Sequence, residues 1–379
     1  MNKINLLYVI TKLELGGAQK HLLSLIAGLN KERFNVFLFT AQDGLLLQEA
    51  FLMENLKIQK SRFLERSINP LKDLLALFEL CLFIRNNGID IVHTHSSKAG
   101  ILGRWAANLA GVKHILHTVH GWSFNDFQTA LVRSLYIFLE RITAVFTDKL
   151  IVVSYYDKQK GLNNRIARED KYEVIRYGIA HESFGLKDFS VREELGIKPG
   201  DFTVGMVSCF KPQKSPQDFV RMAALIKQAL PNTKFILVGE GELRRPVEDL
   251  ISKSGLKQDL ILTGWRKDIP RLLSAMDVFV LTSLWEGLPI SVLEAMAASL
   301  PIVATDTGGI SEVVLGEKTG FLVPPGDVEK IARKVILLLN DEALRKQTGR
   351  NAQQFLVSGF AEGQMIEKTR CLYEYLIKD

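Results

Sequence analysis

The sequence predicts an α/β protein made of two doubly wound parallel sheets. Short apolar runs alternate with helical patterns through both halves of its 379 residues, as in βαβ units whose sheet is covered on both faces. Residues 181–201 interrupt the alternation with Gly185, Gly196, Pro199 and Gly200, a composition typical of an interdomain linker. In such sheets ligands bind beyond the carboxyl ends of the strands. We therefore expect two similar domains whose ligand sites face each other across a cleft.

Six apolar runs in each half are expected to form strands. In the first half they are 4–10, 36–41, 90–95, 114–119, 149–154 and 173–178, with helical patterns between them, for example at 21–29, 70–86, 99–110 and 128–146. In the second half they are 203–209, 234–239, 260–264, 278–283, 301–305 and 320–323. The first run is too short for a signal peptide, so we interpret it as a strand.

Composition and charge restrict the class of protein. Hydrophobic residues make up 47% of the chain and charged residues 24%, which argues against disorder. Three widely spaced cysteines indicate a reducing compartment without a disulfide framework. Residues 1–180 carry 23 Lys and Arg against 16 Asp and Glu, and the rest carries 25 against 26. A basic first half suits anionic lipid, a phosphorylated acceptor or nucleic acid, or it is simply a solvated surface.

Two apolar segments of the first half bear on membrane attachment. The longest apolar stretch, 74–84, is too short to span a bilayer, and 131–146 is a second apolar-rich segment. Together with the basic charge they suggest contact with a membrane face. The alternative is that both are helices buried against the sheet.

Two glutamates lie where a predicted strand, 278–283, passes through a turn into a helix. Glu286 falls in the turn, and Pro289 suits the first helical position. Glu294 falls on a helix that is apolar nearly all round, where a carboxylate is unfavourable unless a partner satisfies it. A ligand with paired hydroxyl groups is one such partner. Stabilisation of an N-terminal-turn glutamate by the helix dipole is the alternative.

Histidines gather between positions 93 and 120. His93 and His95 share one face of a predicted strand, and His120 follows the end of the next strand, where it could bond a ligand hydroxyl. No HExxH or CxxC pattern supports a metal site, so we predict no metal. For His114 and His117 the alternative to a ligand-binding role is an ordinary place in the core or on the surface. Lys98 opens a helix that could hold an anion, and we expect His95 and Lys98 to contact the acceptor substrate.

Loops rich in glycine and lysine follow several strands. Gly17 belongs to a glycine pair before a helix, but GxGxxG is missing, which disfavours a dinucleotide-binding oxidoreductase. Lys211 and Lys214 lie in a proline-restricted loop that suits a diphosphate. A nucleotide base could lie against the backbone after the strand 260–264. The other loops of this kind contain Gly241, Trp265 with Arg266, and Gly308-Gly309.

The run from Glu286 to Glu294, followed by Ala295-Met296-Ala297, resembles the signature of retaining GT-B glycosyltransferases of family 4. The motifs that extend this resemblance are Gly16-Gly17-Ala18, Pro212-Gln213-Lys214, Gly239-Glu240-Gly241, Pro301 to Glu312 and Thr319 to Asp327. The resemblance implies two Rossmann-like domains that face each other across a cleft. The acceptor domain would be 1–182 with a C-terminal helix, 362–379, that crosses back to it, and 183–361 would bind the nucleotide sugar.

The resemblance also implies roles for individual residues. Glu286, His120 and Lys214 would be the catalytic group: Glu286 holds sugar hydroxyls, His120 touches the donor sugar and Lys214 stabilises the leaving diphosphate. Glu294 would bond the ribose hydroxyls. The remaining donor-binding positions are Gly17, Lys211, Gly241, Trp265, Arg266, Gly287 and Leu288. One departure stands out, because Ser208-Cys209 replaces the family's Gly-Arg and removes a phosphate-binding arginine. A second, at Tyr177-Gly178-Ile179-Ala180, has no functional interpretation from the sequence.

The function predicted is transfer of a sugar from a nucleotide diphosphate sugar to an acceptor hydroxyl with retained configuration. Lysine and backbone amides would act on the diphosphate, so no metal or cofactor is expected. We expect a UDP-sugar in preference to a GDP- or ADP-sugar, and a glycan or polyprenyl-diphosphate-linked acceptor in cell-surface polysaccharide or glycolipid synthesis. Nucleic acid is not expected as a partner, whereas an anionic membrane surface is left open. We expect a cytoplasmic location, with peripheral attachment to the inner membrane face left open. The alternatives are a nucleotide-sugar epimerase and a non-catalytic nucleotide-sugar-binding subunit.

Overall fold

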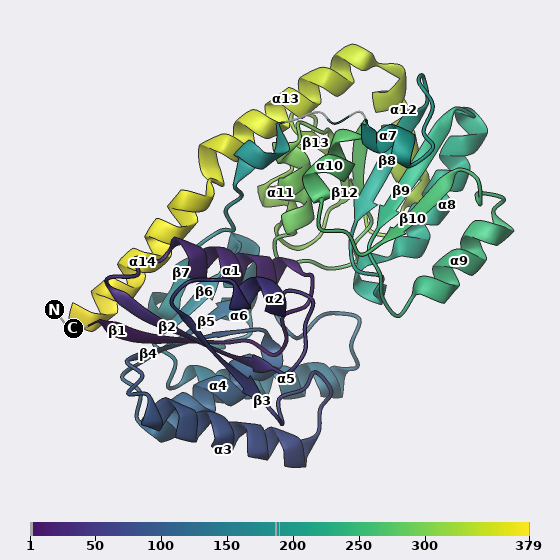
Figure 1. The fold of residues 1–379 in the computed structure, drawn as a ribbon. Coiled ribbons are helices and arrows are strands. Elements are labelled where there is room, and N and C mark those ends of the chain that lie inside the picture. The colour runs from purple at the N-terminus through teal and green to yellow at the C-terminus, as the bar shows by residue number, and fades with distance from the viewer. Residues whose placement is uncertain (1–2, 186–187, 189, 379) are drawn as a thin grey trace. The chain divides into compact units, whose positions relative to one another are not determined.

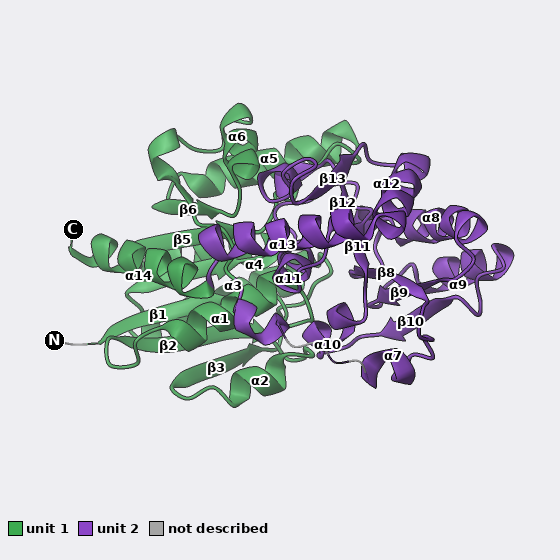
Figure 2. Cartoon of the chain, turned by 90° about the horizontal axis from the view of Figure 1, so that it is seen from above, with its two compact units in different colours: residues 1–178, 362–379 green, residues 179–361 purple. Residues whose placement is uncertain are grey.

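The computed structural model describes residues 3–185, 188 and 190–378. The chain divides into two compact units, the first made of Met1–Gly178 and Glu362–Asp379 and the second of Ile179–Ala361 (Figure 2). The division lies a few residues before the boundary expected between 182 and 183. Each unit contains one parallel sheet with helices on its faces, so the predicted pair of doubly wound α/β sheets is confirmed.

The first unit has a seven-stranded sheet in the order β3-β2-β1-β4-β5-β6-β7 (Figure 1). Its strands are β1 (Ile4–Val9), β2 (Phe34–Ala41), β3 (Leu56–Ser61), β4 (Ile91–His95), β5 (His114–Val119), β6 (Lys149–Val152) and β7 (Tyr172–Val174). β3 has no counterpart among the strands predicted from the sequence. This strand pairs with β2 alone at the edge of the sheet and is only half-buried, so it has no continuous apolar run to reveal it.

Helices cover both faces of this first sheet. They are α1 (Gly17–Gly28), α2 (Leu47–Phe51), α3 (Pro70–Asn86), α4 (Ser97–Ala110), α5 (Ala130–Ala144), α6 (Tyr155–Asn163) and α14 (Glu362–Lys378). Alternate residues of β1 show which helix lies on which face. Leu6 and Tyr8 pack in a core with α1 and α14, whereas Leu7 and Val9 pack in a second core with α3 and α4.

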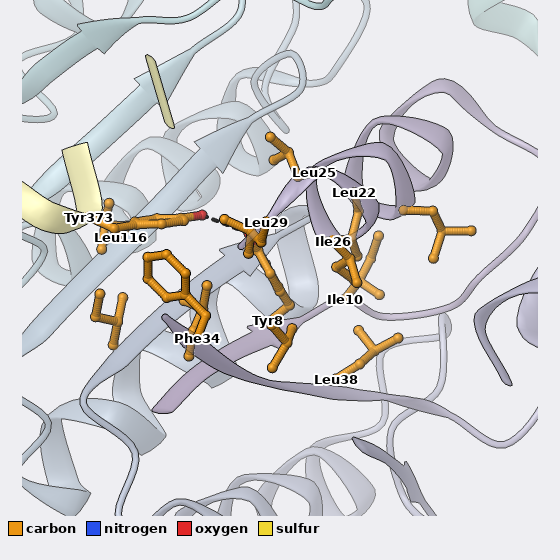
Figure 3. Close-up of a cluster of buried hydrophobic side chains, with 14 of the residues drawn as sticks. Tyr8, Ile10, Leu22, Leu25, Ile26, Leu29, Phe34, Leu38, Leu116 and Tyr373 are labelled. Atoms are coloured by element: carbon orange, nitrogen blue, oxygen red, sulfur yellow. Dashed lines mark hydrogen bonds between the residues drawn. The ribbon is translucent and has the colours of Figure 1, made fainter. Parts of the chain in front are cut away.

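The C-terminal helix α14 is part of the first unit and packs against α1, as predicted for a helix that crosses back. Figure 3 shows its Tyr373 in the core beside Tyr8, Phe34 and Leu116. The hydroxyls of Tyr8 and Tyr373 are hydrogen-bonded at 3.0 Å, and the Tyr373 hydroxyl also bonds His93 Nδ1 at 2.5 Å. Buried polar atoms are therefore paired where the last helix meets the middle of the sheet.

The second unit has a six-stranded sheet in the order β10-β9-β8-β11-β12-β13. Its strands are β8 (Phe202–Val207), β9 (Thr233–Val238), β10 (Leu260–Gly264), β11 (Val278–Leu281), β12 (Ile302–Thr305) and β13 (Gly320–Val323). Its α-helices are α7 (Ser190–Glu194), α8 (Pro216–Ala229), α9 (Arg244–Lys253), α10 (Ile269–Ser274), α11 (Ile290–Ala297), α12 (Val328–Asn340) and α13 (Glu342–Gly359).

Several strands end before the apolar run that predicts them. β8 ends at Val207 rather than 209, and β11 ends at Leu281 rather than 283. The residues released at these carboxyl ends, including Cys209 and Ser283, belong to loops and can turn toward a ligand. Among the helices that the structure describes, none has the length and hydropathy needed to cross a bilayer.

Candidate active site

A buried ion pair joins two loops at the carboxyl ends of β8 and β11. The Lys214 ammonium is paired with Glu286 Oε1, and the Ser283 hydroxyl donates to the same oxygen at 2.6 Å. The side chain of Glu286 is 5% exposed and that of Lys214 is 16% exposed. A carboxylate in such a place is held in one position by its two partners. Two of the predicted catalytic residues are thus in direct contact.

Hydrogen bonds to backbone oxygens hold the loop that carries Lys214 against the loop that carries Glu286. Leu284 N–H donates to Gln213 O at 2.7 Å, and Gln213 Nε2 donates to Trp285 O at 2.9 Å. From the other side, Thr282 Oγ1 donates to Lys214 O at 2.9 Å. The short 3₁₀ turn Pro212–Lys214 therefore lies fixed beside β11, which keeps the ammonium next to the carboxylate.

The glycine pair after β12 lies directly against Glu286 and Gly287. Gly309 N–H donates to Gly287 O at 2.7 Å, and Gly308 has φ +60°. A Cβ on Gly308 would collide with the backbone oxygen of Glu286. Only glycine satisfies both the left-handed conformation and this close approach. The predicted glycine pair thus supports the Glu286 turn.

Glu294 lies on α11, the helix predicted to be buried, and this expectation is confirmed. Seven of its eight residues are buried, and Glu294 itself is 6% exposed. The structure places Pro289 at the N-cap rather than at the first helical position, and the first turn carries no acidic residue. Because Glu294 stands beyond that turn, the helix-dipole explanation does not apply.

The turn after β9 approaches the segment where Cys209 replaces the expected arginine. Gly241 has φ +158°, essentially extended backbone, and a Cβ there would meet the backbone of Phe210. Phe210 N–H donates to Glu240 O at 2.8 Å. The predicted donor position Gly241 is therefore fixed by its fit against 208–210. Lys211, next along the chain, is half-buried beside it.

The side chain of Arg266 is bound to carboxylates of its own unit. Its guanidinium bonds Asp268 at 2.7 and 2.6 Å and Glu194 at 2.9 Å. These partners raise the pKa of Arg266 above its ordinary value. Trp265 is 41% exposed at the end of β10. Trp265 is therefore exposed, whereas the guanidinium of Arg266 is bound by carboxylates of the protein.

In the first unit His120 is held between two aromatic neighbours. Its Nδ1 bonds the Tyr177 hydroxyl at 2.6 Å, and its Nε2 bonds His95 Nδ1 at 2.9 Å. The imidazole rings of His95 and His120 are stacked with centroids 5.1 Å apart. Burial, with the neighbouring His21 and His93, holds the pKa of His120 well below its ordinary value. His120 is therefore neutral, and both its ring nitrogens are engaged.

The two predicted acceptor residues both contact protein partners, but the buried Nε2 of His95 has no hydrogen-bond partner among the described residues. His95 is fully buried, with Nδ1 bonded to His120, so it contacts the loop histidine rather than solvent. The Lys98 ammonium is paired with Asp73 and donates to Ser67 O. Gly17 is the first residue of α1, and its N-cap Gly16 is extended. Thr11 Oγ1 bonds Ser96 Oγ at 2.8 Å, which links the ends of β1 and β4.

Sequence reasoning missed three residues that position the predicted ones: Tyr177, Ser283 and Gln213. Tyr177 is the first residue of the motif that departs from the family pattern. Its hydroxyl bonds His120 Nδ1, so this residue helps to hold the imidazole in place. Ser283 was assigned to a strand and Gln213 to a diphosphate loop. Within the part of the chain that the structure describes, no three histidine, cysteine or carboxylate side chains gather in a way that would hold a metal ion.

Replacing Tyr177 with phenylalanine is expected to lower the free energy of unfolding by about 1 kcal/mol, the usual net value of one hydrogen bond. It should also release His120 Nδ1, so the imidazole populates both neutral tautomers. Nitrogen chemical shifts of the labelled imidazole measure the tautomers, and thermal unfolding measures stability. A lower midpoint with unchanged shifts would show that Tyr177 does not orient the ring.

Two family models match this chain, one in each half. Residues 188–355 match the family model "Glycosyl transferases group 1", and residues 15–183 match "Glycosyltransferase Family 4". An Escherichia coli protein named UDP-Gal:alpha-D-GlcNAc-diphosphoundecaprenol alpha-1,3-galactosyltransferase is 34% identical over 378 residues, covering 98% of this chain and 97% of its own. A Campylobacter jejuni N,N'-diacetylbacillosaminyl-diphospho-undecaprenol alpha-1,3-N-acetylgalactosaminyltransferase is 28% identical, covering 94% and 95%.

Solved structures show the same fold. The crystal structure of Anabaena HepE in complex with UDP and glucose superposes with a TM-score of 0.85 at 21% identity, covering 98% of this chain and 99% of that one. WaaG, a glycosyltransferase involved in lipopolysaccharide biosynthesis, superposes with a TM-score of 0.79 at 16% identity, covering 96% and 98%. The predicted family is confirmed by two adjoining family models and by a relative aligned over almost its full length. The chain belongs to the GT-B glycosyltransferases of family 4 and is a glycosyltransferase.

Proposed function

We propose that this glycosyltransferase moves a sugar from a UDP-sugar to a hydroxyl of a sugar carried on polyprenyl diphosphate, with retained anomeric configuration. The names of the two relatives support the acceptor class, since both specify a diphosphoundecaprenol acceptor. UDP as the carrier nucleotide is supported by the first relative's name and by the ligands of HepE. The product would enter cell-surface polysaccharide or glycolipid synthesis.

The observation that carries the proposal is the contact of Lys214 with Glu286 in loops that follow parallel strands. An ammonium has three donors, so Lys214 can keep one bond to Glu286 and give others to a diphosphate. Glu286, held by Lys214 and Ser283, has lone pairs left for sugar hydroxyls. Glu294, 6% exposed on α11, is the proposed partner of the ribose hydroxyls.

The chemical step is a front-face substitution at the anomeric carbon. The bond from this carbon to the β-phosphate oxygen breaks, and the bond to the acceptor oxygen forms on the same face. The acceptor proton passes to the departing phosphate oxygen. Lys214 and the loop amides stabilise the charge that develops on the diphosphate, which is the transition-state interaction that contributes most to such reactions. The proposal needs no resident metal or cofactor, and activity retained in excess chelator would support that part.

Binding of UDP is expected to raise the thermal unfolding midpoint without added metal, because a ligand of the folded state alone stabilises it. At 100 times its dissociation constant UDP adds about 2.7 kcal/mol. In Glu294→Ala the same UDP concentration should give little or no shift, while Glu362→Ala, at the start of α14, keeps it. A shift with GDP or ADP but not UDP would refute the proposed donor. No shift with any nucleotide would favour a non-catalytic or partner-dependent protein.

A further inference from the structure

Three large aromatic side chains are exposed where the chain leaves neighbouring strands of the first sheet. Phe127 lies in the loop after β5, and Tyr155 and Tyr156 are the first two residues of α6, which follows β6; their exposed fractions are 61%, 59% and 43%. Since β5, β6 and β7 are neighbours in a parallel sheet, the segments that follow them meet at one edge of that sheet. We call these three side chains the aromatic platform.

The ring of Tyr155 is held from one side by a residue that follows β7. The guanidinium of Arg176 lies over this ring, 5.3 Å from its centroid. Such a cation–π contact fixes the ring and occupies one of its two faces. Because more than half of Tyr155 is exposed, the other face is open to solvent. An aromatic face that is held in place and left open is a surface on which a ring-shaped ligand can stack.

The loop after β5 is bound to α6 beneath the aromatic platform. The buried Trp122 donates its indole N–H to Asp157 O at 2.8 Å. The side chain of Asn125, also buried, accepts a hydrogen bond from Phe127 N–H at 2.9 Å. The exposed rings therefore rest on a loop and a helix end whose positions are fixed by buried contacts.

Polar groups border the aromatic platform. Asp126 precedes Phe127, and its carboxylate is paired with Arg133 at 2.8 Å. Burial, with the carboxylates of Asp126 and Asp157, raises the pKa of Tyr156, so its hydroxyl stays protonated and can donate a hydrogen bond. A pyranose ring packs its C–H groups against an aromatic face and bonds its hydroxyls to polar groups at the border. Aromatic faces with a few placed polar groups suit such a ligand.

The aromatic platform is connected to the histidine predicted to act at the donor sugar. Arg176, which holds Tyr155, is followed in the chain by Tyr177, whose hydroxyl bonds His120 Nδ1 at 2.6 Å. Two consecutive residues thus link the platform to His120. The two residues predicted from the sequence to contact the acceptor both have protein partners. The platform therefore offers the acceptor a surface at the same edge of the sheet.

We propose that the aromatic platform binds the sugar of the acceptor substrate, with the pyranose ring stacked on the open face of Tyr155. The inference rests on the proposed function, because it assigns residues to the acceptor named there. A nucleotide base fits less well, since Lys214 and Glu294, proposed to hold the diphosphate and the ribose, belong to the second unit. A polyprenyl chain also fits less well, because it has no hydroxyls for the polar border.

Binding of two short-chain probes to the full chain tests the proposal. One is farnesyl diphosphate linked to N-acetylglucosamine, and the other is farnesyl diphosphate without a sugar. In Tyr155→Ala the dissociation constant of the sugar-bearing probe should rise about tenfold, the scale on which an aromatic ring stacked on a ligand contributes. That of the sugar-free probe should not change. Titration calorimetry measures both constants.

Two control variants make the comparison specific. Tyr155→Phe keeps the ring, so it should bind the sugar-bearing probe nearly as wild type does. Tyr375→Ala removes a tyrosine that is 58% exposed on α14 and should leave both constants unchanged. Equal losses for the two probes in Tyr155→Ala would assign the ring to the lipid or the diphosphate and overturn the proposal. Unchanged binding of the sugar-bearing probe in this variant, or wild-type binding that does not depend on the sugar, would overturn it as well.

Steady-state kinetics separate this proposal from the proposed function. Tyr155→Ala should raise KM for the sugar-bearing probe and leave KM for the UDP-sugar unchanged. If wild type binds the sugar-bearing probe through Tyr155 but transfers no sugar from any UDP-sugar, the proposed function fails and the aromatic platform stands. If transfer occurs and Tyr155→Ala keeps the wild-type KM for the probe, the platform fails and the proposed function stands.

Discussion

Replacing Glu286 with alanine is expected to lower kcat/KM by roughly 10²–10³-fold. The carboxylate holds Lys214 in place and is the proposed partner of the transferred sugar's hydroxyls. Its loss frees the ammonium to move, and a misplacement of about 1 Å can reduce a rate about a hundredfold. It also leaves a nearly buried cation unpaired, which destabilises the fold by about 3 kcal/mol. Steady-state kinetics and thermal unfolding measure the two effects.

A matched pair of variants separates catalysis from stability. Glu286→Gln keeps the shape and a hydrogen bond to Ser283 but not the charge, so it should recover part of the stability and little of the activity. Adding Lys214→Met to Glu286→Ala removes the unpaired cation and should restore stability while activity stays low. Full activity in Glu286→Ala would show that neither the sugar nor Lys214 depends on this carboxylate.

Mild acid is expected to unfold the first unit before the second. Burial lowers the pKa of His21 to about 3 and of His93 to about 3, and it also lowers those of His95, His117 and His120. In the unfolded chain these groups bind protons near pH 6.5, while the folded unit keeps them neutral. Stability is therefore complete above pH 6.5 and is lost as the pH falls toward the folded values, by up to about 1.4 kcal/mol per histidine per pH unit.

Fluorescence reports this transition when the tryptophans of the second unit are replaced. In Trp265→Phe, Trp285→Phe the remaining indoles, Trp105 and Trp122, belong to the first unit. The fluorescence of these two indoles should report unfolding of the first unit at a pH well above 4. The sequence gives the second unit one histidine, His181, so it lacks this source of acid lability. Replacing His21 with leucine should make the transition of the first unit less steep. A transition below pH 4 in both units would contradict the prediction.

The site residues show where prediction from sequence reached its limit. Glu286, Lys214 and Gly308 were predicted from loops that follow parallel strands, and the structure brings these three loops together. The strand order β8-β11-β12 makes this possible, because neighbouring strands end at one edge of the sheet. The hydrogen bonds of the His120 side chain could not be predicted from the position of its loop after a strand. They join His95, His120 and Tyr177, which come from three segments, and pairing between such side chains depends on packing.

Lys98 and Arg266 illustrate the same limit for charged residues. By sequence Lys98 opens a helix that suits an anion, and Arg266 follows a strand where the nucleotide base is expected. In the structure Asp73 binds Lys98, and Asp268 with Glu194 binds Arg266. A basic residue keeps all its donors for a ligand only if no carboxylate of the fold reaches it. That condition depends on three-dimensional distance and not on the residue's place in the chain.

The sequence by itself determined the two α/β units and the strand-end loops, because hydrophobic periodicity and turn residues are local properties of the chain. It indicated the family through the resemblance of its motifs. Tertiary structure decided the rest. It revealed the edge strand β3, paired His120 with His95 and Tyr177, and left the apolar side of α3 and α5 facing outward. An apolar helix face has the same residue pattern in the sequence whether another segment covers it or solvent reaches it. Which one applies depends on the packing of distant segments, and here Leu71 and Phe78 of α3 and Leu131 and Phe138 of α5 remain exposed.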